Sequence, residues 1–250
     1  YTDSFFESVS GITTTGATVI NNLENLSEGI LVWRSLLQWF GGIGIILLAI
    51  SILPTLQIGG MQLLHMEHDD PYEKTLPKIN QFVFEILLLY IFLSIICALL
   101  YYIAGMSGFD SIIHSMTTIS TGGYSSHNKS FAYFDSVFIE SISIIFMIVG
   151  SLPFVIYLQF LHKQNALIFK DDQIKLFFKI LILIIFLTII WLYFFQSIPL
   201  ENSIRASLFN ITSILTGTGY SVNDYSNWGS FGLVIMIIIM FIGGCAGSTT

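Results

Sequence analysis

Three short stretches combine threonine hydroxyls with glycine backbone, the groups best suited to holding a dehydrated cation. They are Thr14-Thr15-Gly16, Thr121-Gly122-Gly123 and Gly217-Thr218-Gly219. A cation that leaves water exchanges its hydration shell for other oxygens, which rings of backbone carbonyls supply in known cation filters. Glycine adopts the unusual φ and ψ angles that turn successive carbonyls to one side, and threonine adds a hydroxyl oxygen. The stretches therefore predict a selectivity filter for a monovalent cation.

The three stretches share one register of an internal repeat. Residues 107 and 203 positions after Gly16 are again glycines, Gly123 and Gly219. Hydroxyl side chains recur in the same register at Ser4, Ser111 and Ser207, at Ser10, Thr117 and Ser213, and at Thr13, Ser120 and Thr216. Repetition on this scale predicts one module used several times around an axis.

Each stretch lies near the end of a short apolar segment. The segments Thr2–Thr18, Phe109–Ser125 and Ser203–Ser221 are too short to cross a bilayer and too apolar for exposed loops. Non-helical backbone lies at membrane depth only where protein buries it or where it lines a water-filled cavity. We expect three re-entrant pore helices. The C-terminus of each would place about half a negative charge at the pore, which favours cations.

The composition supports an all-α membrane protein. Apolar residues make up 54% of the chain and charged residues only 10%, whereas soluble domains carry about 25% charged residues. Apolar runs predict full spans at Ile30–Leu56, Ile79–Ala104, Phe131–Leu161 and Lys175–Phe195, and a run too short to cross at Trp228–Ile242. The chain has no basic excess that would indicate a nucleic-acid partner.

Lysine placement predicts the orientation of these spans. The connections Gly59–Lys78 and His162–Lys179 hold six of the nine Lys and Arg residues. The positive-inside rule makes them cytoplasmic and puts Ser125–Lys129 and Val222–Asn227 outside. The first connection also holds a cluster of possible metal ligands: His65, Glu67, His68, Asp69 and Asp70. We read them as solvated side chains or contacts to a soluble subunit, and not as a metal site.

Four runs of the sequence, SFFESVSGITTTGATV, MTTISTGGYS, RASLFNITSILTGTGYS and FIGGCAGSTT, resemble the TrkH/KtrB/HKT superfamily of K⁺ transporters, and its TrkH branch most closely. The resemblance covers essentially the whole chain. It implies four membrane–pore–membrane repeats around one K⁺ pathway, with the three Thr/Gly stretches as filter strands. Thr121 stands where that superfamily usually has an aliphatic residue, and Gly217 where threonine is commoner.

The last run resembles the superfamily's intramembrane gating loop. It comprises Gly243, Gly244, Cys245, Ala246, Gly247, Ser248 and Thr249. In those relatives the loop interrupts the second helix of the third repeat beneath the filter, as the short run Trp228–Ile242 also suggests. Helix packing is the alternative role for these glycines.

The resemblance divides the chain into repeats. We expect the pore loop and second helix of repeat 1 in residues 1–58, a cytoplasmic loop in 59–78, repeat 2 in 79–162, a cytoplasmic loop in 163–174, and repeat 3 up to the gating loop in 175–250. Tyr1 is not a methionine and the chain ends inside a Gly/Ser/Thr run, so we expect a fragment that lacks the fourth repeat.

The resemblance also implies partners. They are K⁺ as the transported ion with no cofactor, the lipid bilayer of a bacterial inner membrane crossed several times, a second copy in a homodimer, and a cytosolic nucleotide-binding subunit of TrkA or KtrA type. Three alternatives stay open: a Na⁺-selective or Na⁺/K⁺-coupled transporter, a membrane enzyme, and a non-transporting structural subunit. Intact Gly16 favours K⁺, because serine there accompanies Na⁺ in plant relatives. Enzyme motifs such as GxSxG and HExxH are absent from the spans.

Other residues have structural interpretations. Gly41, Gly42 and Gly44 in the first span predict close helix contact. Arg34, Glu85 and Glu140 lie in or near spans and are candidates for buried pairing, with partners that the sequence does not name. Asp3 and Asp110 begin two of the pore helices, where N-capping accounts for them. Pro54 and Pro153 lie inside or near the ends of spans, where a helix kink or stop accounts for them.

Overall fold

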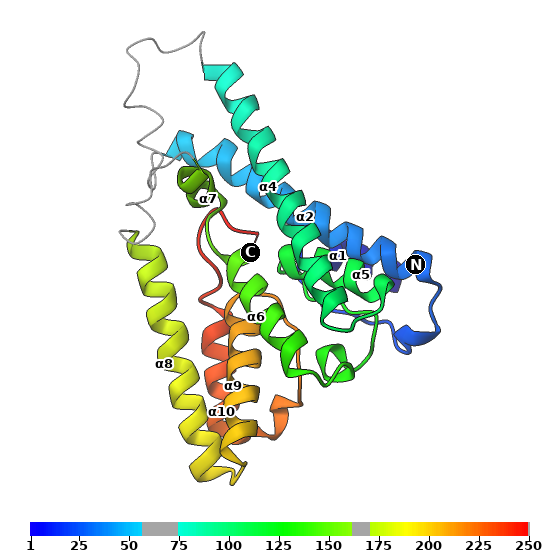
Figure 1. Cartoon of the computed structure of the whole chain (residues 1–250), viewed down its shortest axis with the longest axis vertical. Helices are drawn as coiled ribbons and strands as arrows, with labels where there is room; N and C mark the ends of the chain where they lie inside the picture. Colours follow the sequence, from blue (N-terminus) through cyan, green and yellow to red (C-terminus); the bar gives the residue numbers. More distant parts are fainter. Residues whose placement is uncertain (57–74, 162–170, 250) are drawn as a thin grey trace.

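The computed structural model describes residues 1–56, 75–161 and 171–249. Across these ranges the chain forms helices joined by turns and contains no β-strand, which confirms the all-α prediction (Figure 1). Of the two predicted cytoplasmic loops, residues 59–74 and 163–170 lie outside the described ranges. The described ends of both loops are already helical: one helix begins at Thr75 and another at Asp172.

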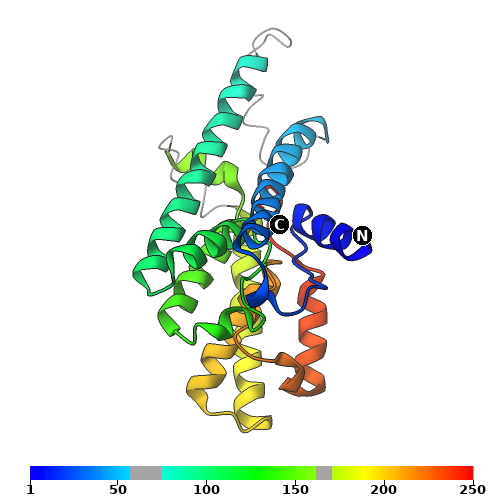
Figure 2. The ribbon, with the colours of Figure 1, turned by 90° about the vertical axis from the view of Figure 1, so that its right-hand side faces the viewer.

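Three helices along the chain, α1, α5 and α9, are each followed by a Thr/Gly turn, a loop and a further helix (Figures 1 and 2). The helices are α1 Thr2–Ile12, α2 Glu28–Leu56, α4 Thr75–Ile103, α5 Gly108–Ile119, α6 Val137–Ser151, α7 Phe154–Leu161, α8 Asp172–Phe195, α9 Leu200–Leu215 and α10 Gly229–Met240. Single 3₁₀ turns lie at Leu23–Asn25, Ser130–Tyr133 and Tyr225–Trp228. The three predicted pore helices are therefore α1, α5 and α9.

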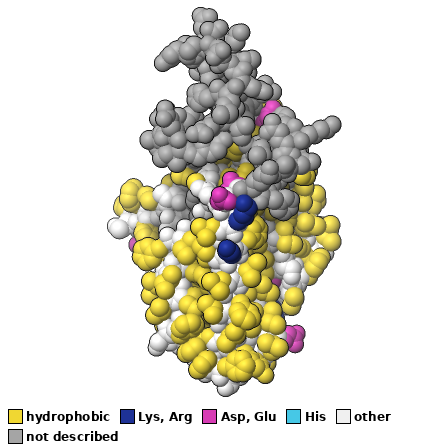
Figure 3. All heavy atoms as spheres, turned by 90° about the vertical axis from the view of Figure 1, so that its left-hand side faces the viewer, with side chains coloured by type: hydrophobic (Ala, Val, Ile, Leu, Met, Phe, Trp, Pro, Cys, Tyr) yellow, Lys and Arg dark blue, Asp and Glu magenta, His cyan; other side chains and the backbone are white. Residues whose placement is uncertain are grey.

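Three stretches within the long helices are apolar and long enough to cross a bilayer. They are Glu28–Leu47, Val83–Ile103 and Asp172–Phe195, with mean hydropathies of 1.6, 2.7 and 2.6. Figure 3 shows a face covered mainly by hydrophobic side chains. Helix α8 exposes apolar side chains such as Ile182 and Phe186, at 65% and 60%. A bilayer is the environment in which such a surface is stable.

The predicted span Phe131–Leu161 is wrong as a single helix. A 3₁₀ turn occupies Ser130–Tyr133, and α6 begins only at Val137, where Ser136 caps it by accepting a hydrogen bond from the Ile139 N–H. The helix then stops at Ser151, because Pro153 has no N–H to donate and disfavours helical backbone at Leu152. The helical stop expected of Pro153 is confirmed, and it leaves the short helix α7.

Two ion pairs with buried carboxylates join pore helices to neighbouring helices. The guanidinium of Arg205 on α9 donates from Nε and Nη2 to the two oxygens of Glu140 on α6, at 2.8 and 2.7 Å. Arg34 on α2 donates to Glu7 on α1 at 3.2 Å. The pairing predicted for Arg34 and Glu140 is thus confirmed. Removing the arginine of either pair would leave a buried carboxylate uncompensated.

The N-capping predicted for two aspartates is wrong. The N-cap of α5 is Ser107, whose hydroxyl accepts from the Asp110 N–H at 3.0 Å. The Asp110 carboxylate instead accepts hydrogen bonds from the hydroxyls of Ser107 and Ser126, both at 2.7 Å. Helix α1 begins after Tyr1, and within the described residues no side chain caps it. Asp3 therefore sits in the first turn, where a negative charge still favours the helix dipole.

Candidate functional site

The three Thr/Gly strands adopt the same backbone conformation. Their first and third residues all have positive φ, at Thr14 and Gly16 (55° and 76°), Thr121 and Gly123 (49° and 75°), and Gly217 and Gly219 (74° and 87°). Left-handed backbone costs a residue with a Cβ atom about 1–2 kcal/mol, whereas glycine adopts it freely. A conformation that is strained at two threonines and repeated at a third site points to a functional constraint.

Each strand is held by the end of its own pore helix. In the first strand, Thr14 N–H donates to the Gly11 carbonyl at 3.0 Å and Gly16 N–H donates to the Ser10 carbonyl at 3.4 Å. The equivalent bonds run from Thr121 to Thr118 (3.0 Å), from Gly123 to Thr117 (3.3 Å), from Gly217 to Ile214 (3.0 Å) and from Gly219 to Ser213 (3.1 Å). The register proposed from sequence is therefore also the register of the hydrogen bonds.

Neighbouring strands approach each other backbone to backbone. A Cβ atom added at Gly16 would lie 2.1 Å from the Gly122 carbonyl oxygen, and one added at Gly123 would lie 1.8 Å from the Thr218 carbonyl oxygen. Strand 1 thus abuts strand 2, and strand 2 abuts strand 3, in the same head-to-tail sense. At Gly219 an added Cβ meets no atom of the described residues within 4 Å.

A glutamine that the sequence analysis did not single out fixes the second strand. The fully buried side chain of Gln38, on α2, donates from Nε2 to the Gly122 carbonyl at 2.6 Å and accepts from the Tyr124 N–H at 3.0 Å. A Cβ at Gly122 would lie 2.4 Å from the amide carbon of Gln38. Strands 1 and 3 carry threonine at this middle position, so Gln38 explains the glycine in strand 2. The signal in the sequence that could have identified Gln38 is a polar amide side chain within an apolar predicted span.

Tyrosines close the contacts between adjacent repeats. Tyr124, one residue after strand 2, donates its hydroxyl hydrogen bond to the Glu7 carbonyl of α1 at 2.9 Å. Tyr220, one residue after strand 3, donates to the His114 carbonyl of α5 at 3.4 Å, and its hydroxyl lies 2.5 Å from the hydroxyl of Thr117. Glu7 and His114 occupy the same repeat position, so both tyrosines bind the pore helix of the preceding repeat in the same way.

The close contact predicted for the glycines of the first span is confirmed at two of the three. A Cβ at Gly41 would lie 2.1 Å from the Ile12 carbonyl at the end of α1, and one at Gly42 would lie 2.9 Å from the Ser120 Cβ after α5. Nothing described lies within 4 Å of a Cβ at Gly44. Helix α2 therefore packs on the ends of two pore helices, which brings strands 1 and 2 together.

The predicted gating loop departs from helix where expected. Helix α10 ends at Met240, and Gly243 and Gly247 have φ of 67° and 81°. The loop binds the break between α6 and α7: Cys245 N–H donates to the Ser151 carbonyl (2.9 Å), Thr249 N–H to the Gly150 carbonyl (3.2 Å), and Phe154 N–H to the Gly247 carbonyl (3.0 Å). It also reaches strand 2, because the hydroxyls of Thr249 and Thr121 lie 3.1 Å apart.

The connections beyond the strands also contact each other. The Asn128 backbone N–H donates to one carboxylate oxygen of Glu24 at 3.0 Å, and the Asn128 side-chain amide donates to the other. These bonds hold the pKa of the Glu24 carboxyl below its usual range. Leu23 N–H completes the contact by donating to the Asn128 side-chain oxygen at 3.1 Å. The loops that follow strands 1 and 2 are therefore tied together on this side of the molecule.

Short pore helices, left-handed strands and long apolar helices define a multi-pass membrane protein built from pore-loop repeats. A model of the TrkH family, described as cation transport proteins, matches residues 1–250. The chain belongs to this family. It is a family of transporters, so the membrane-enzyme alternative is set aside.

Individual relatives agree with the family match. The chain is 40% identical over 250 residues to the Trk system potassium uptake protein TrkI of Halomonas elongata, covering 100% of this chain and 51% of that protein. It is 38% identical over 253 residues to TrkH of Escherichia coli, covering 99% of this chain and 52% of that protein. The chain thus spans about half the length of the curated relatives it matches.

A solved structure has the same fold. The crystal structure of the potassium transporter TrkH from Vibrio parahaemolyticus superimposes with a TM-score of 0.88 at 38% identity, covering 99% of this chain and 51% of that one. The repeated strands described above therefore lie within a fold shared with a known potassium transporter.

Proposed function

We propose that this chain supplies three of the strands of a K⁺ selectivity filter in a potassium uptake protein. The main support is that one left-handed conformation occurs in all three strands and is held by the same hydrogen bonds. Strand 1 also abuts strand 2 in the same sense as strand 2 abuts strand 3. Rings of such backbone oxygens replace the hydration shell of K⁺. Relatives named Trk system potassium uptake proteins support K⁺ as the ion. A further strand in the rest of the protein would fill the open side of Gly219.

Measurement of K⁺/Na⁺ discrimination in the full-length protein tests this proposal. Gly123→Ser adds a Cβ at positive φ, 1.8 Å from a carbonyl of strand 3, and should lower discrimination at least about tenfold. Gly219→Ser should act in the same direction. Gly44→Ala is the matched control, because its Cβ meets no described atom within 4 Å. Unchanged discrimination in both serine variants would remove these residues from the filter.

Selectivity for Na⁺, or coupled Na⁺/K⁺ transport, is the second candidate within the same family. Gly16 is intact and adopts positive φ, which favours K⁺ by the resemblance given above. Uptake of ⁸⁶Rb⁺ that requires external Na⁺ would establish coupling, and uptake of ²²Na⁺ without ⁸⁶Rb⁺ would establish Na⁺ selectivity.

We infer that residues 243–249 form a gate beneath the filter. The loop binds the α6–α7 break through backbone hydrogen bonds and contacts strand 2 through the Thr249 hydroxyl. Three glycines in five residues make continued helix costly, at about 1 kcal/mol each. Deleting Gly244–Ser248 in the full-length protein should raise basal K⁺ flux and leave ion preference nearly unchanged. Loss of selectivity with unaltered flux would instead make the loop part of the filter.

The assembly and orientation are further proposals. By resemblance we propose a homodimer in a bacterial inner membrane, bound to a cytosolic nucleotide-binding subunit of TrkA or KtrA type. Co-purification with such a subunit tests the partner, and the mass of the detergent-solubilised complex tests the dimer.

The lysine distribution puts Asn128 outside the cell and Asn165 inside. A cysteine placed at each position can be labelled in intact cells with a membrane-impermeant thiol reagent. Labelling at position 165 but not at position 128 would contradict this orientation.

A further inference from the structure

One pore-helix position bonds to the loop after its own strand in all three repeats. The residues at this position are Glu7, His114 and Asn210; the last two lie 107 and 203 positions after Glu7. Their side chains differ in chemistry: a carboxylate, an imidazole and an amide. All three side chains are buried. We call them the peg residues.

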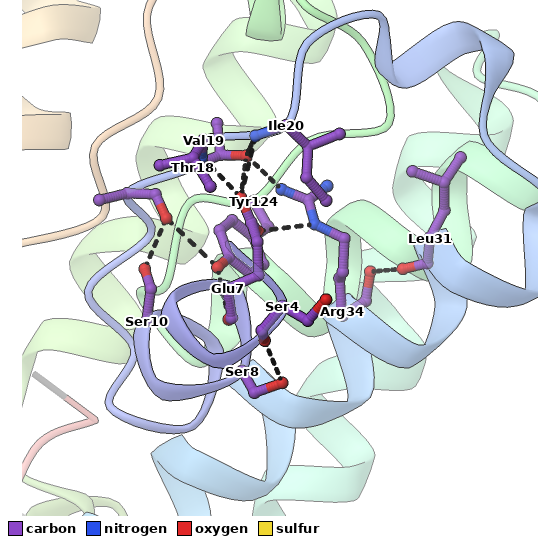
Figure 4. Close-up of polar contacts among 12 residues, drawn as sticks. Ser4, Glu7, Ser8, Ser10, Thr18, Val19, Ile20, Leu31, Arg34 and Tyr124 are labelled. Atoms are coloured by element: carbon purple, nitrogen blue, oxygen red, sulfur yellow. Dashed lines mark hydrogen bonds and ion pairs between the residues drawn. The ribbon is translucent and has the colours of Figure 1, made fainter. Parts of the chain in front are cut away.

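Glu7 makes the largest set of bonds. Its Oε1 accepts from the Thr18 hydroxyl at 2.5 Å, from the Val19 N–H at 2.7 Å and from the Ile20 N–H at 3.2 Å. Figure 4 shows these groups converging on the carboxylate from the loop that follows strand 1. Hydrogen bonds to a charged acceptor are stronger than neutral ones, so this loop is tied firmly to α1.

The other two peg residues bind the equivalent loops. His114 Nε2 lies 3.0 Å from the Ser125 hydroxyl, and Ser125 occupies the repeat position of Thr18. Asn210 accepts from the Val222 N–H at 3.3 Å, and Val222 occupies the position of Val19. Its amide also donates to the Asn223 side-chain oxygen at 2.6 Å. The contact is thus conserved between repeats although the side chains are not.

This geometry anchors each strand at both ends. The N–H groups of the strand bond to the end of the pore helix, and the loop beyond the strand returns to a peg residue inside the same helix. A strand held at both ends keeps its carbonyls at a fixed spacing, which a selective ion site requires.

Glu7 differs from the other peg residues because its pair with Arg34 also reaches the second repeat. Arg34 Nε donates to Glu7 Oε2 at 3.2 Å, and its Nη1 donates to the Ser125 carbonyl at 3.4 Å. The guanidinium carbon lies 4.0 Å from the ring centroid of Tyr124, within cation–π range. Arg34 Nη2 donates to the Thr18 hydroxyl at 3.2 Å, so one buried guanidinium contacts the loops after both strand 1 and strand 2 (Figure 4).

We propose that Glu7, His114 and Asn210 are positioning residues for the filter strands, and that the Glu7–Arg34 pair sets the spacing between strands 1 and 2. This inference rests on the proposed filter. Loss of the pair releases the exits of both strands, and ions of different radius are then discriminated less sharply. The peg residues act through the backbone and do not contact the ion themselves.

Glu7→Gln in the full-length protein tests the pair. It keeps the size of the side chain and removes its charge, and it should lower K⁺/Na⁺ discrimination about three- to tenfold at unchanged K⁺ affinity. Glu140→Gln is the control, because Glu140 is also a buried carboxylate paired with an arginine, and the hydrogen bonds of that arginine among the described residues reach Glu140 and Asp135 but no filter strand. A purely structural role would lower the amount of folded protein in both variants and leave the discrimination ratio of both at the wild-type value.

Two further variants keep the test decisive if Glu7→Gln misfolds. The double variant Glu7→Gln/Arg34→Gln removes both buried charges. His114→Leu puts an apolar side chain against the rings of Phe131 and Phe134, whose centroids lie 5.4 and 5.2 Å from that of the imidazole. A reduced ratio in the variants that fold supports the proposal, and a wild-type ratio in all of them overturns it. If Gly123→Ser also leaves the ratio unchanged, the filter itself is wrong; if Gly123→Ser lowers it, only the positioning role fails.

Discussion

Strands 1 and 2 have the same backbone and different surroundings. Both have positive φ at their first and third residues. In strand 1, Thr14 is half-buried and Thr15 is exposed, whereas the equivalent residues of strand 2, Thr121 and Gly122, are buried between strand 1, strand 3, Gln38 and Thr249. The local conformation is therefore independent of enclosure, because it depends on hydrogen bonds to the strand's own helix.

Enclosure decides instead which side chain each strand position can hold. The middle residue is Thr15 in strand 1 and Gly122 in strand 2. Only in strand 2 does a buried amide occupy the space that a side chain would need, with Gln38 lying 2.4 Å from an added Cβ. Three sets of substitutions in the full-length protein separate the local contribution from that of enclosure.

The largest effect is expected from Gly122→Thr, which gives strand 2 the sequence of strand 1. The new side chain would overlap Gln38, and overpacking at such a site costs about 1–3 kcal/mol. We expect a lower thermal unfolding midpoint and reduced K⁺/Na⁺ discrimination. Thr15→Gly is the reverse control and should lower stability less. Adding Gln38→Ala should restore part of the loss; wild-type behaviour of Gly122→Thr would contradict the account of enclosure.

An intermediate effect is expected from Gln38→Leu, which removes the bond to strand 2 and the bond to Tyr124 directly after it, and leaves the side-chain space filled. The Tyr124 N–H and the Gly122 carbonyl lose their partner, at a cost of about 1–2 kcal/mol. Hydrogen exchange should accelerate in peptides covering 120–126 and stay unchanged in those covering 13–19. Equal acceleration in both would show that Gln38 supports the fold generally and not strand 2.

The smallest effect on stability is expected from paired changes at the first strand position, Thr14→Val and Thr121→Val. Each hydroxyl donates to the preceding carbonyl, at 2.7 and 2.8 Å. Thr121 also contacts Thr249 of the proposed gating loop at 3.1 Å. One hydrogen bond contributes about 0.5–1.5 kcal/mol, so Thr121→Val should raise basal K⁺ flux about two- to tenfold while Thr14→Val should not. Equal basal K⁺ fluxes in the two variants would show that the contact between Thr121 and Thr249 does not hold the proposed gating loop closed.

The sequence predicted most of what depends on local order along the chain. Apolar runs located the long helices, and the short segments before each Thr/Gly stretch were found as α1, α5 and α9. The break at Pro153 was predicted, yet its consequence for the span Phe131–Leu161 was missed, because hydropathy does not register a lost N–H donor. The N-cap Ser107 was missed for a similar reason, since Asp110 three residues later is also a common capping residue.

What the sequence determined by itself is the repeat. Its register gave the strands, the positions of the left-handed residues and the helix ends that hold them, because these interactions join residues close in the chain. Only the tertiary structure decided the partners that lie far apart in the chain, such as Glu7 with Arg34 and Gln38 with Gly122. Those contacts join residues 27 and 84 positions apart. Their selection depends on how α2 packs against two pore helices, which no local periodicity encodes.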